Sequence, residues 1–374
     1  MDNIKDVENL SFLRKEFNSE ISKVIVGQNK IIDQIFIAIL CNGHIILEGV
    51  PGLAKTLLIN SVAKAFALNF NRIQFTPDLM PSDITGTEII QENKSSGKRE
   101  FKFYKGPIFS NIILADEINR TPPKTQSALL QAMQENDVTI GNETYKLNNP
   151  FFVFATQNPI EQEGTYPLPE AQLDRFMFNL LIDYPSIDEE TLIVKKMNDI
   201  TKTEIQPIIS IEKLKTFQDI VINMPVSDNV VDYIVNLVRS TRITEHADVS
   251  IKKWLNWGAG PRASSVLLLA SKANALINGR TTPEIEDVKN IPDIVPLIQI
   301  DYETQTLYFS DPSLQTIDSL YSLENLIRFG RKDCADTVKV DIPRNFGFML
   351  DTLFSKSSII TENEQGIPIV LSNI

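Results

Sequence analysis

Residues 49–56 read Gly49-Val50-Pro51-Gly52-Leu53-Ala54-Lys55-Thr56. An apolar run precedes this octet at residues 44–47, and a helical pattern follows it at residues 57–63. A strand, a glycine-containing turn and a helix in this order bring backbone N–H groups together around an anion. Lys55 would add a positive charge for the outer phosphates of a nucleotide, and Thr56 a hydroxyl for Mg²⁺. The octet matches a phosphate-binding loop except at Ala54, where the pattern has glycine, so other motifs must support this interpretation.

The composition is that of a globular protein, with 43% hydrophobic and 22% charged residues among 374, and the length suits two or three domains. The net charge of −12 and the lack of a long basic run argue against nucleic acid and anionic lipid as partners. Two cysteines, Cys41 and Cys334, are too few for a disulfide framework. The polar N-terminal residues do not resemble a signal peptide, and no apolar run approaches the ~20 residues that span a bilayer. We therefore expect a cytoplasmic protein that does not insert into membranes directly.

Strands and helices alternate up to Pro185. The strands are continuous apolar runs, which is typical of a parallel sheet that helices cover on both faces. Residues 88–104 and 138–147 each read as a β-hairpin, because turn residues separate two short strand patterns. The predicted fold class is α/β: a parallel sheet with β-hairpin insertions. We expect strands at residues 44–47, 72–76, 111–117, 151–156 and 176–182, and helices at about 8–24, 29–41, 57–63, 122–135 and 169–174.

The pattern becomes helical after Pro185. Pro261 at a helix start, and acidic residues behind Pro283, are typical N-terminal signals. We predict three parts: a core at residues 1–185, an α-helical domain at 186–300 and a C-terminal extension at 301–374. The helical domain should contain helices at about 187–199, 211–222, 227–241, 261–278 and 283–290, and the extension helices near 316–329 and 343–355 and a strand at 367–371.

Two acidic residues, Asp116 and Glu117, end an apolar strand. Open α/β sheets place their ligand sites at such strand ends. Phosphoryl transfer needs one carboxylate to hold Mg²⁺ and another to orient or deprotonate water, and adjacent residues of a strand point to different sides. Two solvated acids are the alternative, and on their own we would favour it. The phosphate-binding loop upstream makes the functional interpretation the better one.

Three more polar residues stand where they could contact a nucleotide. Asn158 follows the next apolar strand and could position the water or contact the terminal phosphate, with a simple turn residue as the alternative. Arg175 precedes the last strand and could reach the nucleotide of a neighbouring subunit or form a surface ion pair. Arg262 lies in the first turn of a predicted helix, where a cation is unfavourable to the helix dipole, which indicates a phosphate partner or an exposed side chain. The two histidines, His44 and His246, make no catalytic arrangement.

Together these motifs resemble the MoxR family of AAA+ ATPases. The resemblance covers about residues 8–300 in unbroken order and is highly specific. Alanine before the lysine of the loop is usual in this family, so Ala54 becomes a family feature. The matching segments are VIVGQ at 24–28, GH and then the octet at 43–56, FTPDL and PSDITG at 75–86, ADEINR and PPKTQSALL at 115–130, ATQNP at 155–159, LPEAQLDRF at 168–176 and GPRAS at 260–264.

The resemblance implies the residues that bind the nucleotide and its metal. Lys55 and Thr56 would be the Walker A residues, and Asp116 and Glu117 the Walker B residues. Thr56 and Asp116 would hold Mg²⁺, and Glu117 would act in catalysis. The ATP-binding set would also include Val26, Gly27, Gly49, Val50, Pro51, Gly52, Leu53 and Ala54.

The resemblance also implies roles outside the Walker motifs. Asn158 would be sensor 1, Arg175 an arginine finger acting in trans, and Arg262 sensor 2, either in cis or in trans. The hairpins at 88–104 and 138–147 resemble the helix-2 insert and the pre-sensor-1 hairpin. The fold implied is an AAA+ core with a helical lid domain.

The implied function is hydrolysis of Mg²⁺-bound ATP in a homo-oligomeric ring, of six subunits by analogy, to remodel or activate a protein client. Proteins with a von Willebrand factor A domain are the expected client class. A nucleotide-switched scaffold with little turnover is an alternative, against which the complete set of Glu117, Asn158 and Arg175 argues. A DNA-linked motor is less favoured because the net charge is −12. A His-Arg pair usual in the family near residues 295–298 is absent, and the sequence leaves the client and the role of residues 301–374 open.

Overall fold

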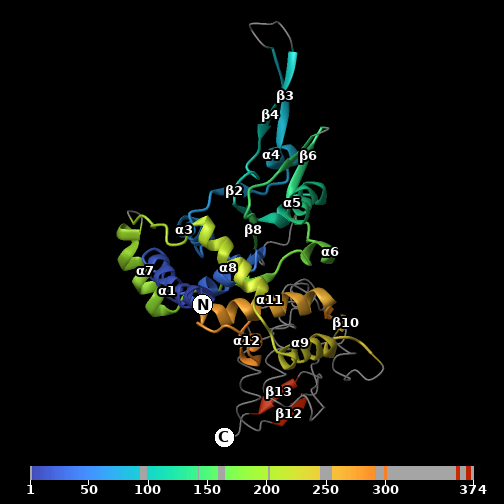
Figure 1. Cartoon of the computed structure of the whole chain (residues 1–374). Helices are drawn as coiled ribbons and strands as arrows, with labels where there is room; N and C mark the ends of the chain where they lie inside the picture. The colour runs from blue at the N-terminus through green and yellow to red at the C-terminus, as the bar shows by residue number, and fades with distance from the viewer. Residues whose placement is uncertain are drawn as a thin grey trace. The chain divides into compact units, whose positions relative to one another are not determined.

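The computed structural model of the chain describes residues 2–92, 99–141, 143–158, 165–200, 203–244, 255–291, 299–300, 359–362 and 368–371 (Figure 1). The chain forms two compact units. The first comprises Met1–Val230 with Val266–Val295, and the second comprises Val231–Ser265 with Pro296–Ile374. Among the described helices, none is both long and apolar enough to cross a bilayer.

A five-stranded parallel sheet forms the centre of the first unit, in the order β2-β5-β8-β1-β9. Every residue of β1 and β5 is buried, so both faces of the sheet are covered and the predicted α/β fold is confirmed. Because the strands are parallel, the carboxyl ends of β1, β5 and β8 meet at one edge. The strands are β1 (Ile45–Glu48), β2 (Phe70–Gln74), β5 (Ile112–Asp116), β8 (Phe152–Gln157) and β9 (Phe178–Leu181).

The strand β2 lies at the edge of this sheet, and only Ile73 of its residues is buried. Its register with β5 pairs Arg72 with Leu114 and Gln74 with Asp116. Side chains two positions apart in a strand lie on the same face. Arg72 and Gln74 therefore share one face, beside the carboxyl end of β5.

The helices of the core form where the apolar periodicity predicts them. α1 (Asp2–Ile21) packs against α2 (Asn29–Leu40) and against α3 (Lys55–Ala65), which in turn contacts β2 and β5. The aromatic rings of Phe17, Phe36 and Phe66 join these three helices, with ring centroids between 5.0 and 5.3 Å apart. The other predicted core helices are α5 (Pro123–Glu135) and α6 (Glu170–Leu173).

Two short helices form where the sequence predicts none: α4 (Pro81–Thr85) and η1 (Ile118–Arg120). Proline suits the first position of α4 because that position needs no N–H donor. The carboxylate of Asp83 accepts a hydrogen bond from the N–H of Met80 at 2.9 Å, which satisfies a donor at the helix start. The Pro-x-Asp spacing was therefore a helix signal that the loop interpretation of this segment missed.

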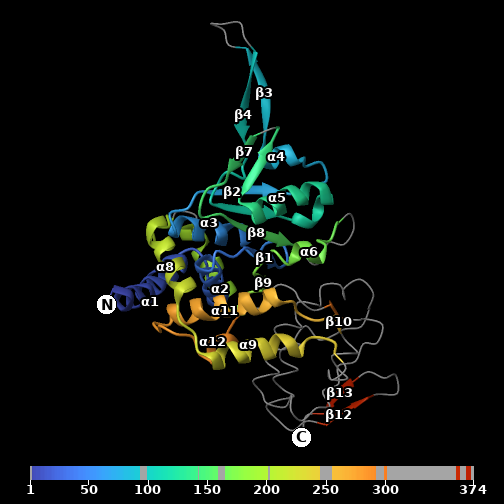
Figure 2. The ribbon, with the colours of Figure 1, turned by 45° about the vertical axis from the view of Figure 1, so that its right-hand side comes forward.

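Both predicted hairpins are confirmed. β3 (Gly86–Glu92) pairs with β4 (Arg99–Lys105), and β6 (Asp137–Ile140) pairs with β7 (Glu143–Lys146). The ring of Phe103 stacks on that of Tyr145 at 4.4 Å, so the two hairpins contact each other. Figure 2 shows the β3–β4 hairpin projecting away from the sheet.

The helices predicted after Pro185 are also present, and small strands accompany them. β10 (Leu255–Trp257) pairs with β11 (Gln299–Ile300), and β12 (Ile359–Glu362) pairs with β13 (Pro368–Leu371); only β13 was predicted. The helices predicted near 316–329 and 343–355 lie outside the described residues, and the division at residues 185 and 300 stays a prediction. The helices are α7 (Ile187–Ile200), α8 (Ile211–Asn223), α9 (Asp228–Ser240), α11 (Pro261–Ile277) and α12 (Ile285–Lys289).

Candidate nucleotide site

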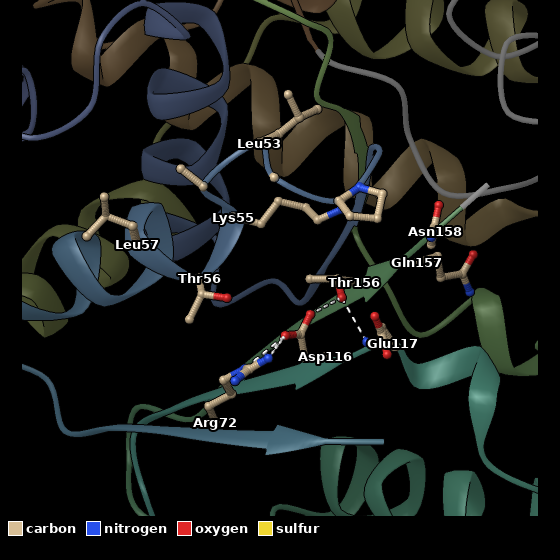
Figure 3. Close-up of a pocket in the computed structure, with 13 residues that line it drawn as sticks. Leu53, Lys55, Thr56, Leu57, Arg72, Asp116, Glu117, Thr156, Gln157 and Asn158 are labelled. Atoms are coloured by element: carbon tan, nitrogen blue, oxygen red, sulfur yellow. Dashed lines mark hydrogen bonds and ion pairs between the residues drawn. The ribbon is translucent and has the colours of Figure 1, made fainter. Parts of the chain in front are cut away.

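The candidate site is built on the loop between β1 and α3 (Figure 3). A Cβ at Gly49 would lie 2.7 Å from the carbonyl oxygen of Ile182, so the loop needs glycine where it leaves the sheet. Gly52 has a φ of +90°, which L side chains rarely adopt. The loop ends at Ala54, the N-cap of α3, and no side chain caps this helix. The N–H groups of its first turn are therefore available to an anion.

The backbone of Ala54 explains why phosphate-loop patterns have glycine at this position. Its φ and ψ are 56° and 25°, which lie in the left-handed helical region. An L-residue with a Cβ pays roughly 1–2 kcal/mol there, whereas glycine does not. The alanine that departs from the general pattern therefore sits in a conformation that favours the missing glycine.

Ala54→Gly is expected to raise the free energy of unfolding of the nucleotide-free protein by about 1 kcal/mol, because relief of left-handed strain outweighs the entropy of glycine in the unfolded chain. Urea denaturation followed by circular dichroism measures this change. Ala128→Gly in the middle of the right-handed helix α5 is the matched control, and it should lower the same quantity by about 1 kcal/mol. Similar losses in both variants would contradict strain at Ala54.

The two acids at the end of β5 are held by one hydroxyl of the neighbouring strand β8. The Thr156 Oγ1 donates to Asp116 Oδ1 at 2.5 Å and accepts from the backbone N–H of Glu117 at 2.8 Å. Glu117 has a φ of +57° and lies outside the strand. The two carboxylates therefore diverge because the chain turns at Glu117, and the strand alternation from which we predicted the divergence was the wrong reason.

Two residues of the edge strand β2 contact the same acids, and sequence reasoning missed both. Arg72 donates to Asp116 Oδ2 from Nε at 2.8 Å and from Nη2 at 2.6 Å. Gln74 Nε2 donates to Glu117 Oε2 at 2.7 Å, and Arg120 Nη1 donates to the same oxygen at 2.8 Å. The signal in the sequence was the polar alternation around Ile73, but it becomes informative only once β2 is known to lie beside β5.

The Lys55 ammonium folds back onto its own loop. It donates to the carbonyl oxygen of Gly49 and approaches that of Val50 at 3.4 Å. Burial lowers the pKa of Lys55 below the usual value of a lysine, and the charges of Asp116 and Glu117 act in the opposite direction. Phosphate oxygens would offer this half-buried cation a stronger, charged acceptor than the two carbonyls.

These residues enclose a pocket of about 430 Å³. Most predicted site residues line it, and Gly49 and Val50 lie in the same loop just outside the lining. Arg72, Thr156, Gln157 and Leu57 line it as well, although none of them was predicted as a site residue. The lining consists of Pro51, Gly52, Leu53, Ala54, Lys55, Thr56, Leu57, Arg72, Asp116, Glu117, Thr156, Gln157 and Asn158.

Besides Gly49 and Val50, four predicted site residues do not belong to this lining. Val26 and Gly27 lie between α1 and α2, where Gly27 has a φ of +70° and a Cβ would clash with Glu189. Arg175 follows α6 and donates from Nη2 to Gln134 Oε1 at 3.1 Å. Arg262 lies in the first turn of α11, as predicted, and belongs to the second compact unit.

The oxygen donors of the pocket fit Mg²⁺. Within the described part of the chain, no group of three or more His, Cys, Asp or Glu side chains could hold a metal on its own. Mg²⁺ is usually bound through one or two carboxylates, completed by water and substrate phosphates. The Asp116 carboxylate and the Thr56 hydroxyl line one pocket with the loop, which is the donor set such a site requires.

Comparison with known proteins also supports the interpretation of this pocket as a nucleotide site. The model of the ATPase family associated with various cellular activities (AAA) matches residues 44–178. Chaperone MoxR1 of Mycobacterium tuberculosis is 45% identical over 278 residues, which cover 74% of this chain and 72% of that protein. Protein MoxR of Methylorubrum extorquens is 27% identical over 297 residues, or 75% of this chain and 85% of that protein. A solved structure of a candidate ATPase from Cytophaga hutchinsonii matches with a TM-score of 0.75 and 41% identity, over 87% of this chain and 96% of that one.

Proposed function

This chain belongs to the MoxR family of AAA+ ATPases, and from that membership we propose that it hydrolyses Mg²⁺-bound ATP in an oligomeric ring to remodel or activate a protein client. It is a nucleotide-binding ATPase with a chaperone-like role. The observation that carries the proposal is the pocket itself. It brings the loop residues Lys55 and Thr56 together with Asp116, Glu117 and Asn158, which come from three separate segments of the chain.

In this proposal the loop binds the phosphates. The N–H groups at the start of α3 and the Lys55 ammonium contact the outer phosphates, and Lys55 exchanges its carbonyl partners for phosphate oxygens. Thr56 and Asp116 would hold Mg²⁺, which would neutralise charge on the phosphates when bound. Val26 and Gly27 are proposed as further nucleotide contacts, by family resemblance.

Glu117 is the proposed general base. Its carboxylate takes the proton of the water that attacks the γ-phosphorus, as the bond to the β–γ bridging oxygen breaks. Gln74 and Arg120 hold one oxygen of this carboxylate, Oε2. Asn158 is buried at the pocket wall and is proposed to position the water or the terminal phosphate.

Two arginines are proposed to complete the site. Arg175 bonds to Gln134 of its own chain and stays out of its own pocket, which supports an action on the nucleotide of a neighbouring subunit. Arg262 is proposed as sensor 2. A ring of six subunits is proposed by analogy with the family, and its client is proposed to be a protein with a von Willebrand factor A domain.

The organisation of the chain is part of the same proposal. Residues 1–185 would be the AAA+ core, residues 186–300 the lid domain and residues 301–374 a family-atypical extension. A cytoplasmic location is proposed because two cysteines are too few for a disulfide framework, and because Cys41, in the described part of the chain, is a free and buried thiol.

Steady-state ATPase assays test the proposed function. Mg²⁺-dependent turnover is expected, with stimulation by a purified protein that has a von Willebrand factor A domain, and size measurements should show ATP-dependent assembly. ATP-dependent assembly with negligible turnover, with and without that protein, would favour the scaffold instead. Stimulation by single-stranded DNA would favour a DNA-linked motor, against which the net charge of −12 argues.

A further inference from the structure

The Asp116 carboxylate, proposed to hold Mg²⁺, already has protein donors on both of its oxygens. Thr156 Oγ1 donates to Oδ1 at 2.5 Å, and the Arg72 guanidinium reaches Oδ2 with two nitrogens at 2.6 and 2.8 Å. Only about 9% of the Asp116 surface is exposed. A metal ion that approached this carboxylate in this arrangement would meet a cation at one oxygen and a hydroxyl at the other.

Charge makes this arrangement selective. Besides Arg72, the pocket holds the Lys55 ammonium, whose pKa is already lowered by burial. The pocket therefore places two cations beside the acid that a divalent ion would need, and together they balance the negative charges of Asp116 and Glu117. An approaching divalent ion is repelled by these cations, and the repulsion is strong where water is partly excluded. Nucleotide phosphates would reverse this balance, because they bring several negative charges into the same cavity.

Arg72 is also placed so that it can leave. Its side chain is 47% exposed on the edge strand β2, and it lines the same pocket as the phosphate-binding loop. Arg72 also donates to Oε1 of Gln74, and Nε2 of the same Gln74 amide donates to the carboxylate of Glu117. A guanidinium binds both carboxylate and phosphate groups in bidentate fashion, so an incoming phosphate offers it a new acceptor within the pocket.

We propose that Arg72 makes metal binding at Asp116 conditional on nucleotide. Without nucleotide, Arg72 binds the carboxylate and excludes free divalent cations, and it releases Asp116 only when phosphates enter and bind the guanidinium. The inference rests on the proposed Mg²⁺–ATP site and deepens it, because it assigns a role to a residue outside the Walker and sensor motifs. Metal and nucleotide would then bind together, and a divalent ion without nucleotide would stay out.

Binding of Mn²⁺ to the nucleotide-free protein, followed by electron paramagnetic resonance, tests the inference. Arg72→Gln is expected to bind Mn²⁺ at least tenfold more tightly than the unaltered protein, and adding Asp116→Asn should remove this gain. Arg72→Lys keeps the positive charge, so its Mn²⁺ affinity should stay close to that of the unaltered protein. This variant replaces Arg72→Gln in the comparison if the glutamine variant does not fold. Arg239→Gln, at an exposed arginine of α9, controls for loss of one positive charge.

A second measurement uses ATP in the presence of a chelator. Without metal, Arg72→Gln should bind a fluorescent ATP analogue severalfold more weakly than the unaltered protein, because the guanidinium is no longer there to receive the phosphates. Equal Mn²⁺ affinities of Arg72→Gln and the unaltered protein would overturn the inference. If the unaltered protein itself shows no Mg²⁺-dependent hydrolysis, the proposed function fails. If the unaltered protein hydrolyses ATP but the Mn²⁺ affinity does not change on substitution of Arg72, only this inference fails.

Discussion

Glu117→Gln is expected to slow ATP hydrolysis by roughly 10²–10⁴-fold while leaving ATP binding intact. The amide has nearly the shape of the carboxylate but cannot take a proton from water. The backbone N–H of Glu117 keeps its bond to Thr156, so the turn after β5 should persist. Single-turnover hydrolysis measures the loss, and binding of a fluorescent ATP analogue measures the affinity.

Glu16→Gln is the matched control for this variant, because Glu16 is an exposed glutamate on α1, away from the pocket lining. It should hydrolyse ATP at the rate of the unaltered protein. Near-normal turnover by Glu117→Gln would contradict the assignment of Glu117 as the general base. A parallel loss of ATP affinity would instead mean that the substitution disturbs the turn at Glu117 and the loop opposite it.

Arg175→Ala is expected to abolish most turnover of the assembled protein, with a loss of roughly 10³-fold or more if the arginine stabilises the transition state as a finger in trans. Binding of ATP to the isolated chain should change little, because Arg175 lies outside its own pocket and bonds to Gln134. A large loss of ATP affinity in the isolated chain would contradict a position of Arg175 outside its own pocket.

Mixing experiments decide whether the site is shared between subunits. Lys55→Ala removes the phosphate-binding lysine, so rings of either single variant should be inactive. When the two variants are mixed, an intact Lys55 can face an intact Arg175 across some interfaces, and part of the activity should return. Failure to recover any activity from mixed rings, whose assembly is verified by size, would argue against a finger in trans. Arg239→Ala, at an exposed arginine outside the pocket lining, controls for the loss of an arginine and should keep full activity.

The order of elements was predictable because each core strand is a short apolar run with turn residues at its ends. β5 and β8 also carry the acids and the amide at their carboxyl ends, so Asp116, Glu117 and Asn158 could be named from the sequence and found around one pocket. Here local pattern and final position agree, because parallel strands bring their carboxyl ends to one edge.

The partners of these residues could not be predicted, because they depend on which strands are neighbours. The contact of Arg72 with Asp116 joins residues 44 positions apart, and it exists only because β2 pairs with β5. The left-handed backbone of Ala54 was equally hidden, since alanine alone favours a right-handed helix. The strand β10 escaped prediction because its partner β11 is two residues long and more than forty residues away.

The close approach of Gly49 to Ile182 has a mechanical consequence. The N–H of Ile182 donates to the carbonyl of Glu48 at 2.7 Å, directly before the loop, and the chain then leaves the sheet for α7. The phosphate-binding loop and the segment that connects β9 to α7 are therefore held together at one point, where Ile182 contacts Glu48 and Gly49. A side chain at residue 49 would force this joint apart. The joint lies shortly before α7 (Ile187–Ile200), so the start of this helix is tied through Ile182 to the base of the phosphate-binding loop.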